Sequence, residues 1–292
     1  MIEVELRYTG NLADHNRLDF YDASQALMGF QRSLAIFTHL ALNGEVITQA
    51  PSLKGAQIIT EAPSEGSFRS KAWIVIGGMF AMGSVGKDSP VGHVITSLYD
   101  YALSETMGFH PDYNKTLQAQ YAEHLAEKKI TQEKIDSAIE KAESGIAHMH
   151  RPIFASKTAT MADIHTRPQN GPARKLGPDM SMLTHDYIAH TTRAPDPNTI
   201  VGVISSYNIN TFKGRIFSHE HQRPIAFELV PSAQKPRVIN QITRSLRLNA
   251  ADRKDARAIL QMEAHRLESS TGRLKALHVI SVGAPSDEVL LL

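Results

Sequence analysis

The sequence contains no cysteine among its 292 residues, and this absence excludes several kinds of site. Disulfide bonds, zinc sites built on thiolates and a cysteine nucleophile all require that residue. The N-terminus also lacks the basic start and apolar run of a secretory signal, because it alternates apolar with polar residues. A chain with neither feature is compatible with the cytoplasm, which is the location we expect.

Long apolar runs are scarce as well. One stretch without any charged residue is residues 72–86, which is 15 residues long and includes four glycines. A membrane-spanning helix needs about 20 apolar residues. We therefore expect no membrane span here, and interpret the stretch as a buried strand leading into a glycine-rich turn. A hairpin that inserts into a membrane is the alternative.

A strong net charge is lacking, but the charge is unevenly distributed. The formal net charge is +1, so no global field draws the chain to nucleic acid or membrane. From Pro197 onward there are 13 Lys and Arg against 8 Asp and Glu, whereas the residues up to Asp196 hold 18 against 22. Basic character is therefore confined to the C-terminal part.

The composition is that of a globular protein, with 42% hydrophobic and 21% charged residues. A chain of this length predicts two domains. We expect an α+β domain at 1–110, a helical insertion at 111–152, a proline-rich linker at 153–196, a β-barrel at 197–283 and a tail at 284–292.

Apolar spacing in the first 110 residues predicts a β-α-β-β-α unit. The first helix is expected to begin at Asp22, whose side chain can accept from free amides of the first turn, with Gln25 completing a capping-box pattern. Asn43 and Gly44 predict the end of this helix, because Asn and Gly readily adopt the left-handed conformation that terminates helices. The other expected elements are strands at 2–8, 56–62 and 67–76, a turn at 63–66 and a helix at 90–107.

The middle of the chain predicts helices followed by loop. Residues 114–146 are charged and helical in pattern, and Thr131 has the character of a new N-cap, so we expect two short helices. Residues 148–197 contain six prolines. This composition predicts a loop with one short helix at 180–189 and a domain boundary at 193–198.

The C-terminal part predicts an OB-like five-stranded barrel. Its element order is β-β-β-α-β-β, with the helix between the third and fourth strands, as an OB-type barrel requires. An SH3-like barrel or an open sheet is the alternative. The expected strands are 199–208, 213–219, 224–230, 258–267 and 273–282, and the expected helix is 236–248.

Two glycine-rich motifs fail as catalytic or nucleotide sites. Residues 83–89 follow an apolar strand, but Ala81 replaces the first glycine of a phosphate-binding loop and Asp88 replaces its Ser or Thr. Met82 occupies the glycine position of a nucleophile elbow around Ser84. We therefore predict no catalytic residue and no cofactor, and the sequence favours a protein that is not an enzyme.

The histidines, 14 in all, include two pairs at i and i+2: His148 with His150, and His219 with His221. Side chains two apart on a strand share a face and can chelate one ion. Each pair lacks a third ligand nearby in sequence, so we predict no metal site and exposed loop histidines. His165, His185 and His190 could contribute only by folding back.

Cations of the barrel are the best candidates for a binding site. In OB barrels the second and third strands and nearby loops bind oligonucleotides, with cations on phosphate and aromatic rings stacked on bases. We expect Phe217 and Phe227 in the core, and Tyr207 and Phe212 as exposed platforms. The predicted nucleic-acid-binding residues are Lys213, Arg215, Arg223, Arg237, Arg244, Arg247, Tyr207 and Phe212.

Two long stretches resemble known bacterial domains. LRYTGNLADHNRLDFYDASQALMGFQRSL and NGEVITQAPSLKGAQIITEAPSEGSF resemble one domain of unknown function, and GVISSYNINTFKGRIF with IAFELV and ITRSL resembles a second that accompanies it. The resemblance implies a bacterial origin, two domains and a phage-defence or mobile-element setting. It carries over no catalytic residue.

These observations favour a non-enzymatic binding or assembly protein that self-associates or holds a protein partner. Well-formed domains without a convergent polar site are the reason. The first alternative is a single-stranded nucleic-acid-binding protein that acts through the barrel. The second is a metal-assisted hydrolase that uses the histidines of the linker.

Overall fold

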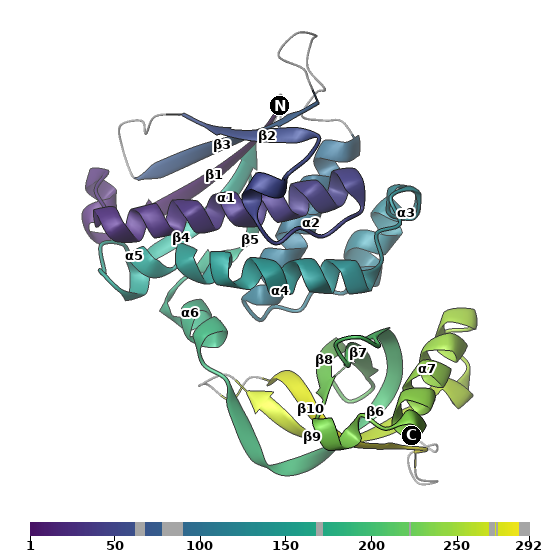
Figure 1. The fold of residues 1–292 in the computed structure, drawn as a ribbon. Helices are drawn as coiled ribbons and strands as arrows, with labels where there is room; N and C mark the ends of the chain where they lie inside the picture. Colours follow the sequence, from purple (N-terminus) through teal and green to yellow (C-terminus); the bar gives the residue numbers. More distant parts are fainter. Residues whose placement is uncertain are drawn as a thin grey trace. The chain divides into compact units, whose positions relative to one another are not determined.

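The computed structural model describes residues 1–61, 68–77, 90–167, 172–221, 223–268, 272 and 274–285. The chain forms two compact units, Met1–Ala189 and His190–Leu292 (Figure 1). Both contain a five-stranded sheet and helices, so the protein is α+β. The turn expected at 63–66 and the motifs at 83–89 lie outside the described residues. No helix in the described part is long and apolar enough to cross a membrane.

The first unit is built on an antiparallel sheet with strand order β2-β3-β1-β4-β5. Its central strand β1 turns Ile2, Val4, Leu6 and Tyr8 toward the core, as their alternation predicted. The strands are β1 (Ile2–Thr9), β2 (Ala56–Thr60), β3 (Arg69–Ile76), β4 (Met161–Arg167) and β5 (Arg174–Met180).

Helices cover the inner face of this sheet (Figure 1). The two longest, α1 and α4, meet at Gly29 and Gly145, where a Cβ on either residue would collide with the backbone of the other helix. Short helical turns lie at Asn11–His15, Ala50–Ser52 and Asn114–Gln118. The helices are α1 (Phe20–Asn43), α2 (Pro90–Thr106), α3 (Ala119–Glu127), α4 (Gln132–Met149), α5 (Arg151–Phe154) and α6 (Met182–Ala189).

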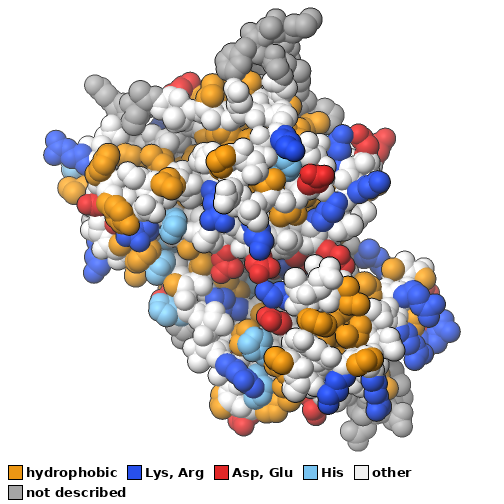
Figure 2. Space-filling view, in the orientation of Figure 1, with side chains coloured by type: hydrophobic (Ala, Val, Ile, Leu, Met, Phe, Trp, Pro, Cys, Tyr) orange, Lys and Arg blue, Asp and Glu red, His pale blue; other side chains and the backbone are white. Residues whose placement is uncertain are grey.

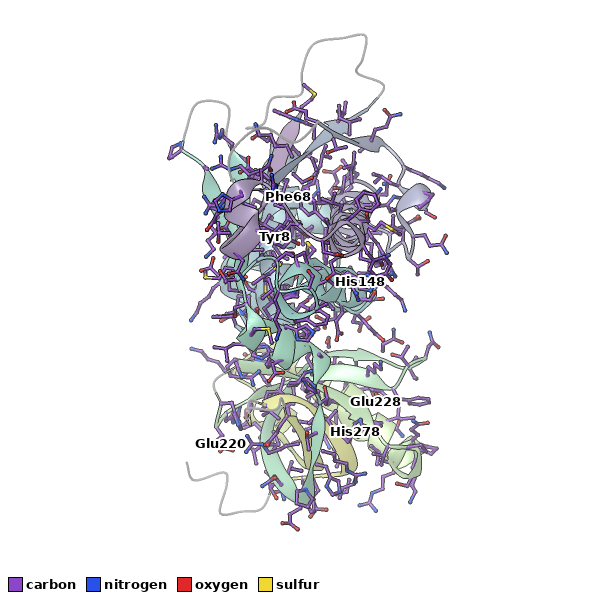
Figure 3. All side chains as sticks on the ribbon, turned by 90° about the vertical axis from the view of Figure 1, so that its left-hand side faces the viewer. Tyr8, Phe68, His148, Glu220, Glu228 and His278 are labelled. Atoms are coloured by element: carbon purple, nitrogen blue, oxygen red, sulfur yellow. The ribbon has the colours of Figure 1, made fainter. Side chains whose placement is uncertain are left out.

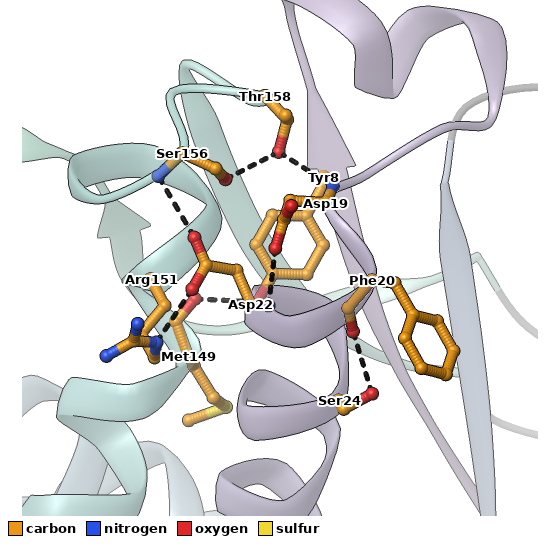
Figure 4. A network of polar contacts seen from close by, with 9 residues as sticks. All are labelled: Tyr8, Asp19, Phe20, Asp22, Ser24, Met149, Arg151, Ser156 and Thr158. Atoms are coloured by element: carbon orange, nitrogen blue, oxygen red, sulfur yellow. Dashed lines mark hydrogen bonds and ion pairs between the residues drawn. The ribbon is translucent and has the colours of Figure 1, made fainter.

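The prediction that Asp22 caps the first helix is wrong. Asp19 is the N-cap, and its carboxylate accepts from the Asp22 backbone amide at 3.0 Å. The Asp22 side chain instead binds Arg151 at 2.8 Å and the amide of Ser156 at 3.0 Å (Figure 4). Both aspartates are good caps, and the partners that lie far along the chain decide which one serves.

The expected loop at 153–196 is also wrong over much of its length, because β4 and β5 lie within it. β4 pairs with β1, so these residues complete the sheet of the first unit. Gly177 and Pro178 gave β5 the composition of a loop, but an edge strand tolerates both. The helices α4 and α6 begin close to where the sequence predicted, and Thr131 caps α4 as expected.

The second unit is a closed barrel with strand order β10-β8-β7-β6-β9. Neighbouring strands are antiparallel, except that β8 and β10 are parallel. The expected boundary at 193–198 lies inside β6, which begins earlier than predicted. The elements are β6 (Thr192–Asn208), β7 (Lys213–Ser218), β8 (Arg223–Leu229), α7 (Pro236–Ala251), η5 (Ala256–Ala258), β9 (Leu260–Glu268) and β10 (Leu274–Gly283), with a short turn η4 at Pro231–Ala233.

Candidate nucleic-acid interface

Helix α7 presents a basic stripe to solvent. Arg237, Arg244 and Arg247 are spaced by seven and three residues, which places them on one face of the helix. All three are exposed, whereas Ile242 and Ser245 on the opposite face are buried. Lys and Arg side chains gather over this helix in Figure 2. Arg237, Arg244 and Arg247, which the sequence predicted as binding residues, thus lie together on one helix.

The positive charge of the second unit is concentrated on α7 and η5. Residues 235–257 contain seven Lys and Arg and two acidic residues, whereas the other residues from Pro197 onward contain six of each. The basic surface therefore occupies one helix and the turn that follows it. Its cations are Lys235, Arg237, Arg244, Arg247, Arg253, Lys254 and Arg257.

A cavity of about 460 Å³ lies beside this stripe, between α7, η5 and the end of β10. Arg244 and Arg257 border it, and Ala258 and Leu260 give it apolar walls. The side-chain oxygen of Gln241 at its edge is buried and has no hydrogen-bond partner among the described residues. The cavity thus combines cations, an amide and apolar surface.

The two arginines of the cavity differ in how they are held. Arg257 binds Asp255 through Nε at 2.9 Å and Nη2 at 2.8 Å, and these hydrogen bonds lower the pKa of the Asp255 carboxyl. Within the described part of the chain, Arg244 makes no hydrogen bond and no ion pair. Arg244 is therefore the side chain that an anionic ligand could engage without breaking an existing bond.

The predicted cations of β7 and β8 lie apart from this stripe, since α7 packs against β6, β10 and η5. Lys213 is directly opposite Glu228, which in turn is the neighbour of His278 on β10 (Figure 3). Arg215 is only 6% exposed. Arg223 donates to the Leu274 carbonyl at 2.9 Å. The structure does not bring these three cations to the basic surface.

The prediction that Tyr207 is an exposed stacking platform is wrong. Tyr207 is buried, its ring is parallel to Phe227 with centroids 6.1 Å apart, and burial raises the pKa of its hydroxyl. Its side chain belongs to the core of the second unit, together with Phe227. Phe212, expected to be exposed, is half-buried against the same core. Phe217, expected in the core, is only half-buried on β7. Phe227 is in the core, as predicted.

Comparison with family models divides the chain as the structure does. Residues 4–188 match a model described as "Domain of unknown function (DUF7946)". The chain belongs to the DUF7946 family. Residues 196–283 match a second model, described as "Family of unknown function (DUF7947)". The two matches confirm the resemblance to a two-domain family of unknown function. Neither the curated proteins nor the solved structures provide a match.

The DUF7946 unit buries a histidine that was expected to lie exposed in a loop. His150 is fully buried, with Nδ1 2.9 Å from the Ile146 carbonyl and Nε2 3.0 Å from the Thr184 hydroxyl. Burial lowers its pKa to about 4, so it is neutral near pH 7. His185 stacks on Phe154. Among the described residues, no three His, Asp or Glu side chains gather into a metal site.

Sequence reasoning missed part of the DUF7947 surface. Gln241 and Arg257 border the cavity. Arg253 and Lys254 are exposed in the segment between α7 and η5. The run RKDAR at 253–257 was the available signal, because four of its residues are charged within one short segment. Its relation to α7 depends on the turn η5, which the sequence did not predict.

Proposed function

We propose that this protein binds single-stranded nucleic acid through its barrel unit. The observation that carries the proposal is the concentration of exposed cations on α7 and η5 beside a cavity with apolar walls. We also assign the barrel to the OB-like class. Its strand order, the parallel pair of β8 and β10 and the position of α7 between the third and fourth strands support this assignment.

The dimensions of the surface suit a flexible strand. The stripe from Arg237 to Arg247 covers about 15 Å of helix, at about 1.5 Å per residue, which lets its cations contact successive phosphates. The cavity of about 460 Å³ falls within the usual size of a small-molecule site. A nucleobase with hydrogen-bond donors could face Gln241 while its phosphate lies near Arg244.

Salt dependence of binding tests the proposal. We expect a fluorescent single-stranded oligonucleotide to bind at low salt, and the triple variant Arg237→Ala, Arg244→Ala, Arg247→Ala to lose roughly 30-fold or more in affinity. The slope of log affinity against log salt should fall by about 2, since each phosphate contact on a single strand contributes about 0.7.

A charge-matched variant of the first unit, Arg17→Ala with Lys115→Ala and Lys141→Ala, is the control and should bind like the parent. The proposal fails if the parent does not bind at low salt, or if both triple variants bind equally. A cytoplasmic location and the phage-defence or mobile-element setting implied by the sequence would supply single strands as targets.

Assembly with another protein or with a second copy is the other candidate function. Large apolar side chains are exposed along the first half of α1, where Phe20 is 87%, Tyr21 62% and Met28 64% exposed. Exposed apolar patches of this kind mark interaction sites. Light scattering tests self-association, and Phe20→Ser should shift any oligomer toward the monomer.

A further inference from the structure

The outer face of the first unit's sheet carries charged side chains from three neighbouring strands. Residues on β1 alternate, so Glu3, Glu5 and Arg7 point away from the helices that cover the inner face. Strand register sets their neighbours. Glu5 lies opposite His165 of β4 and Lys71 of β3, Glu3 lies opposite Arg167 and Trp73, and Arg7 lies opposite Asp163 and Arg69.

Six of these side chains line one small cavity of about 100 Å³. A water molecule occupies about 30 Å³ of the liquid, so the cavity has room for about three waters, or for one tetrahedral phosphate group. The lining side chains are Glu3, Glu5, Arg7, Arg69, His165 and Arg167.

His165 is held in one orientation. Its Nδ1 lies 3.0 Å from Oδ1 of Asp163, and Asp163 is 8% exposed. Arg7 fixes this carboxylate through Nε at 3.1 Å and Nη2 at 2.6 Å. A carboxylate that accepts from Nδ1 orients an imidazole and leaves Nε2 as the nitrogen for chemistry. Arg7 and Asp163 are thus positioning residues for His165.

Glu5 and Arg167 also line the cavity. Glu5 is 4.0 Å from Nε of Arg69, a separation at the limit of an ion pair. Arg167 is exposed and, among the described residues, makes no hydrogen bond and no ion pair. A carboxylate, an imidazole and guanidinium groups therefore converge on a space the size of a phosphate.

We propose that this cavity is an RNA-cleaving site that works without a metal ion. Glu5 takes the proton of a ribose 2′-hydroxyl, and the 2′-oxygen attacks the adjacent phosphorus. His165, protonated at Nε2, gives its proton to the departing 5′-oxygen. Arg69 and Arg167 stabilise the charge on the phosphorane.

The step balances without a further reactant. The bond from the 2′-oxygen to phosphorus forms and the bond from phosphorus to the 5′-oxygen breaks, which leaves a 2′,3′-cyclic phosphate and a 5′-hydroxyl. The nucleophile belongs to the substrate, so the lining residues need to supply only a base, an acid and cations. Protons exchange with solvent to restore Glu5 and His165.

Trp73 offers both a contact and a reporter. It shares the outer face with Lys71 and lies beside Glu3 on the neighbouring strand, so a base next to the scissile phosphate could stack on it. It is the only tryptophan of the chain. Its fluorescence therefore reports a strand on this sheet, whereas binding to the barrel unit has to be measured on the labelled oligonucleotide.

The decisive experiment incubates the full chain with a fluorescent RNA in EDTA and identifies the products. We expect cleavage to a 2′,3′-cyclic phosphate and a 5′-hydroxyl, and no cleavage when the scissile ribose is 2′-deoxy. Glu5→Gln and His165→Gln should each lose at least about 100-fold, the usual contribution of a general acid or base. The matched controls Glu61→Gln and His15→Gln, both exposed, should cleave like the parent.

Several results would overturn the proposal. These are no cleavage by the folded parent, equal cleavage of the 2′-deoxy strand, or activity in both site variants. Since a variant could misfold, the dependence of the cleavage rate on pH gives a second measurement. The parent should show a bell-shaped curve, and Glu5→Gln should lose the fall in rate on the acidic side of that curve. The α7 triple variant separates this proposal from the binding function, because it should still cleave a short RNA at high concentration.

Discussion

The two units use charge in different ways. In the first unit, charged side chains form specific pairs in which the carboxylate is buried and the arginine is partly exposed, such as Asp22 with Arg151 and Asp163 with Arg7. In the second, the excess cations are exposed on α7 and η5, and Arg244 has no ion pair within the described residues. We infer that these ion pairs fix structure in the first unit, whereas the exposed cations of α7 in the second are available to a ligand. Substitutions in each unit, with stability and binding as the measured quantities, test this contrast.

Removing the carboxylate of Asp22 should have the largest effect. Asp22→Ala leaves Arg151 and the Ser156 amide without their acceptor, and breaking such a buried pair costs roughly 3–5 kcal/mol of the free energy of unfolding. Denaturant unfolding followed by the fluorescence of Trp73 measures the first unit. Glu61→Ala, at an exposed position of the same unit, is the control and should change little. Equal stability of the two variants would contradict the contrast.

Acid should destabilise the first unit through His150. Its pKa is about 4 in the folded protein and about 6.5 when unfolded, so the unfolded state binds more protons between these values. The contribution of His150 to the free energy of unfolding is therefore fully present above pH 6.5. It falls by about 3 kcal/mol when the pH is lowered to 4. His150→Gln removes this component, and the difference between its pH dependence and that of the parent measures it. Parallel curves would contradict the assignment.

In the second unit, a close backbone contact rather than a charged pair should be the most sensitive point for stability. A Cβ at Gly202 would collide with the carbonyl oxygen of Phe217 on the neighbouring strand, so Gly202→Ala should cost about 1–3 kcal/mol. At Gly283 a Cβ would have no atom of the described residues within 4 Å, which makes Gly283→Ala a matched control in the same barrel. Hydrogen exchange of barrel peptides measures both, and similar protection in the two variants would count against this account.

Local patterns predicted the elements that depend on local physics. The alternation of β1, the apolar stripe of α1 and the order of strands and helix in the barrel all follow from spacing of apolar residues. The same reasoning failed where distant residues decide. Asp19 and Asp22 are equivalent as caps until Arg151 binds one of them, and β5 resembles a loop until β4 pairs with it.

The two candidate sites differ in the same way, because one is built from a single helix and the other from several strands. The cations of α7 lie within one helix, so their spacing in sequence was sufficient to group them. Glu5, Arg69 and His165 come from three strands, and only the register of the sheet brings them around one cavity. The burial of Tyr207 likewise depends on its packing against Phe227 of another strand. The spacing of residues along the sequence does not reveal which residues face each other across neighbouring strands.

The smallest expected effect on stability is also the sharpest test of the contrast between the units. Arg247 is exposed on α7, and surface substitutions of this kind change the free energy of unfolding by no more than about 0.5 kcal/mol. If its charge is free for phosphate, Arg247→Ala should still reduce the slope of log affinity against log salt by about 0.7. Thermal unfolding and oligonucleotide titration on the same preparation measure both quantities. A loss of stability without a change in slope would mean that α7, like the charged pairs of the first unit, uses its cations to hold the fold.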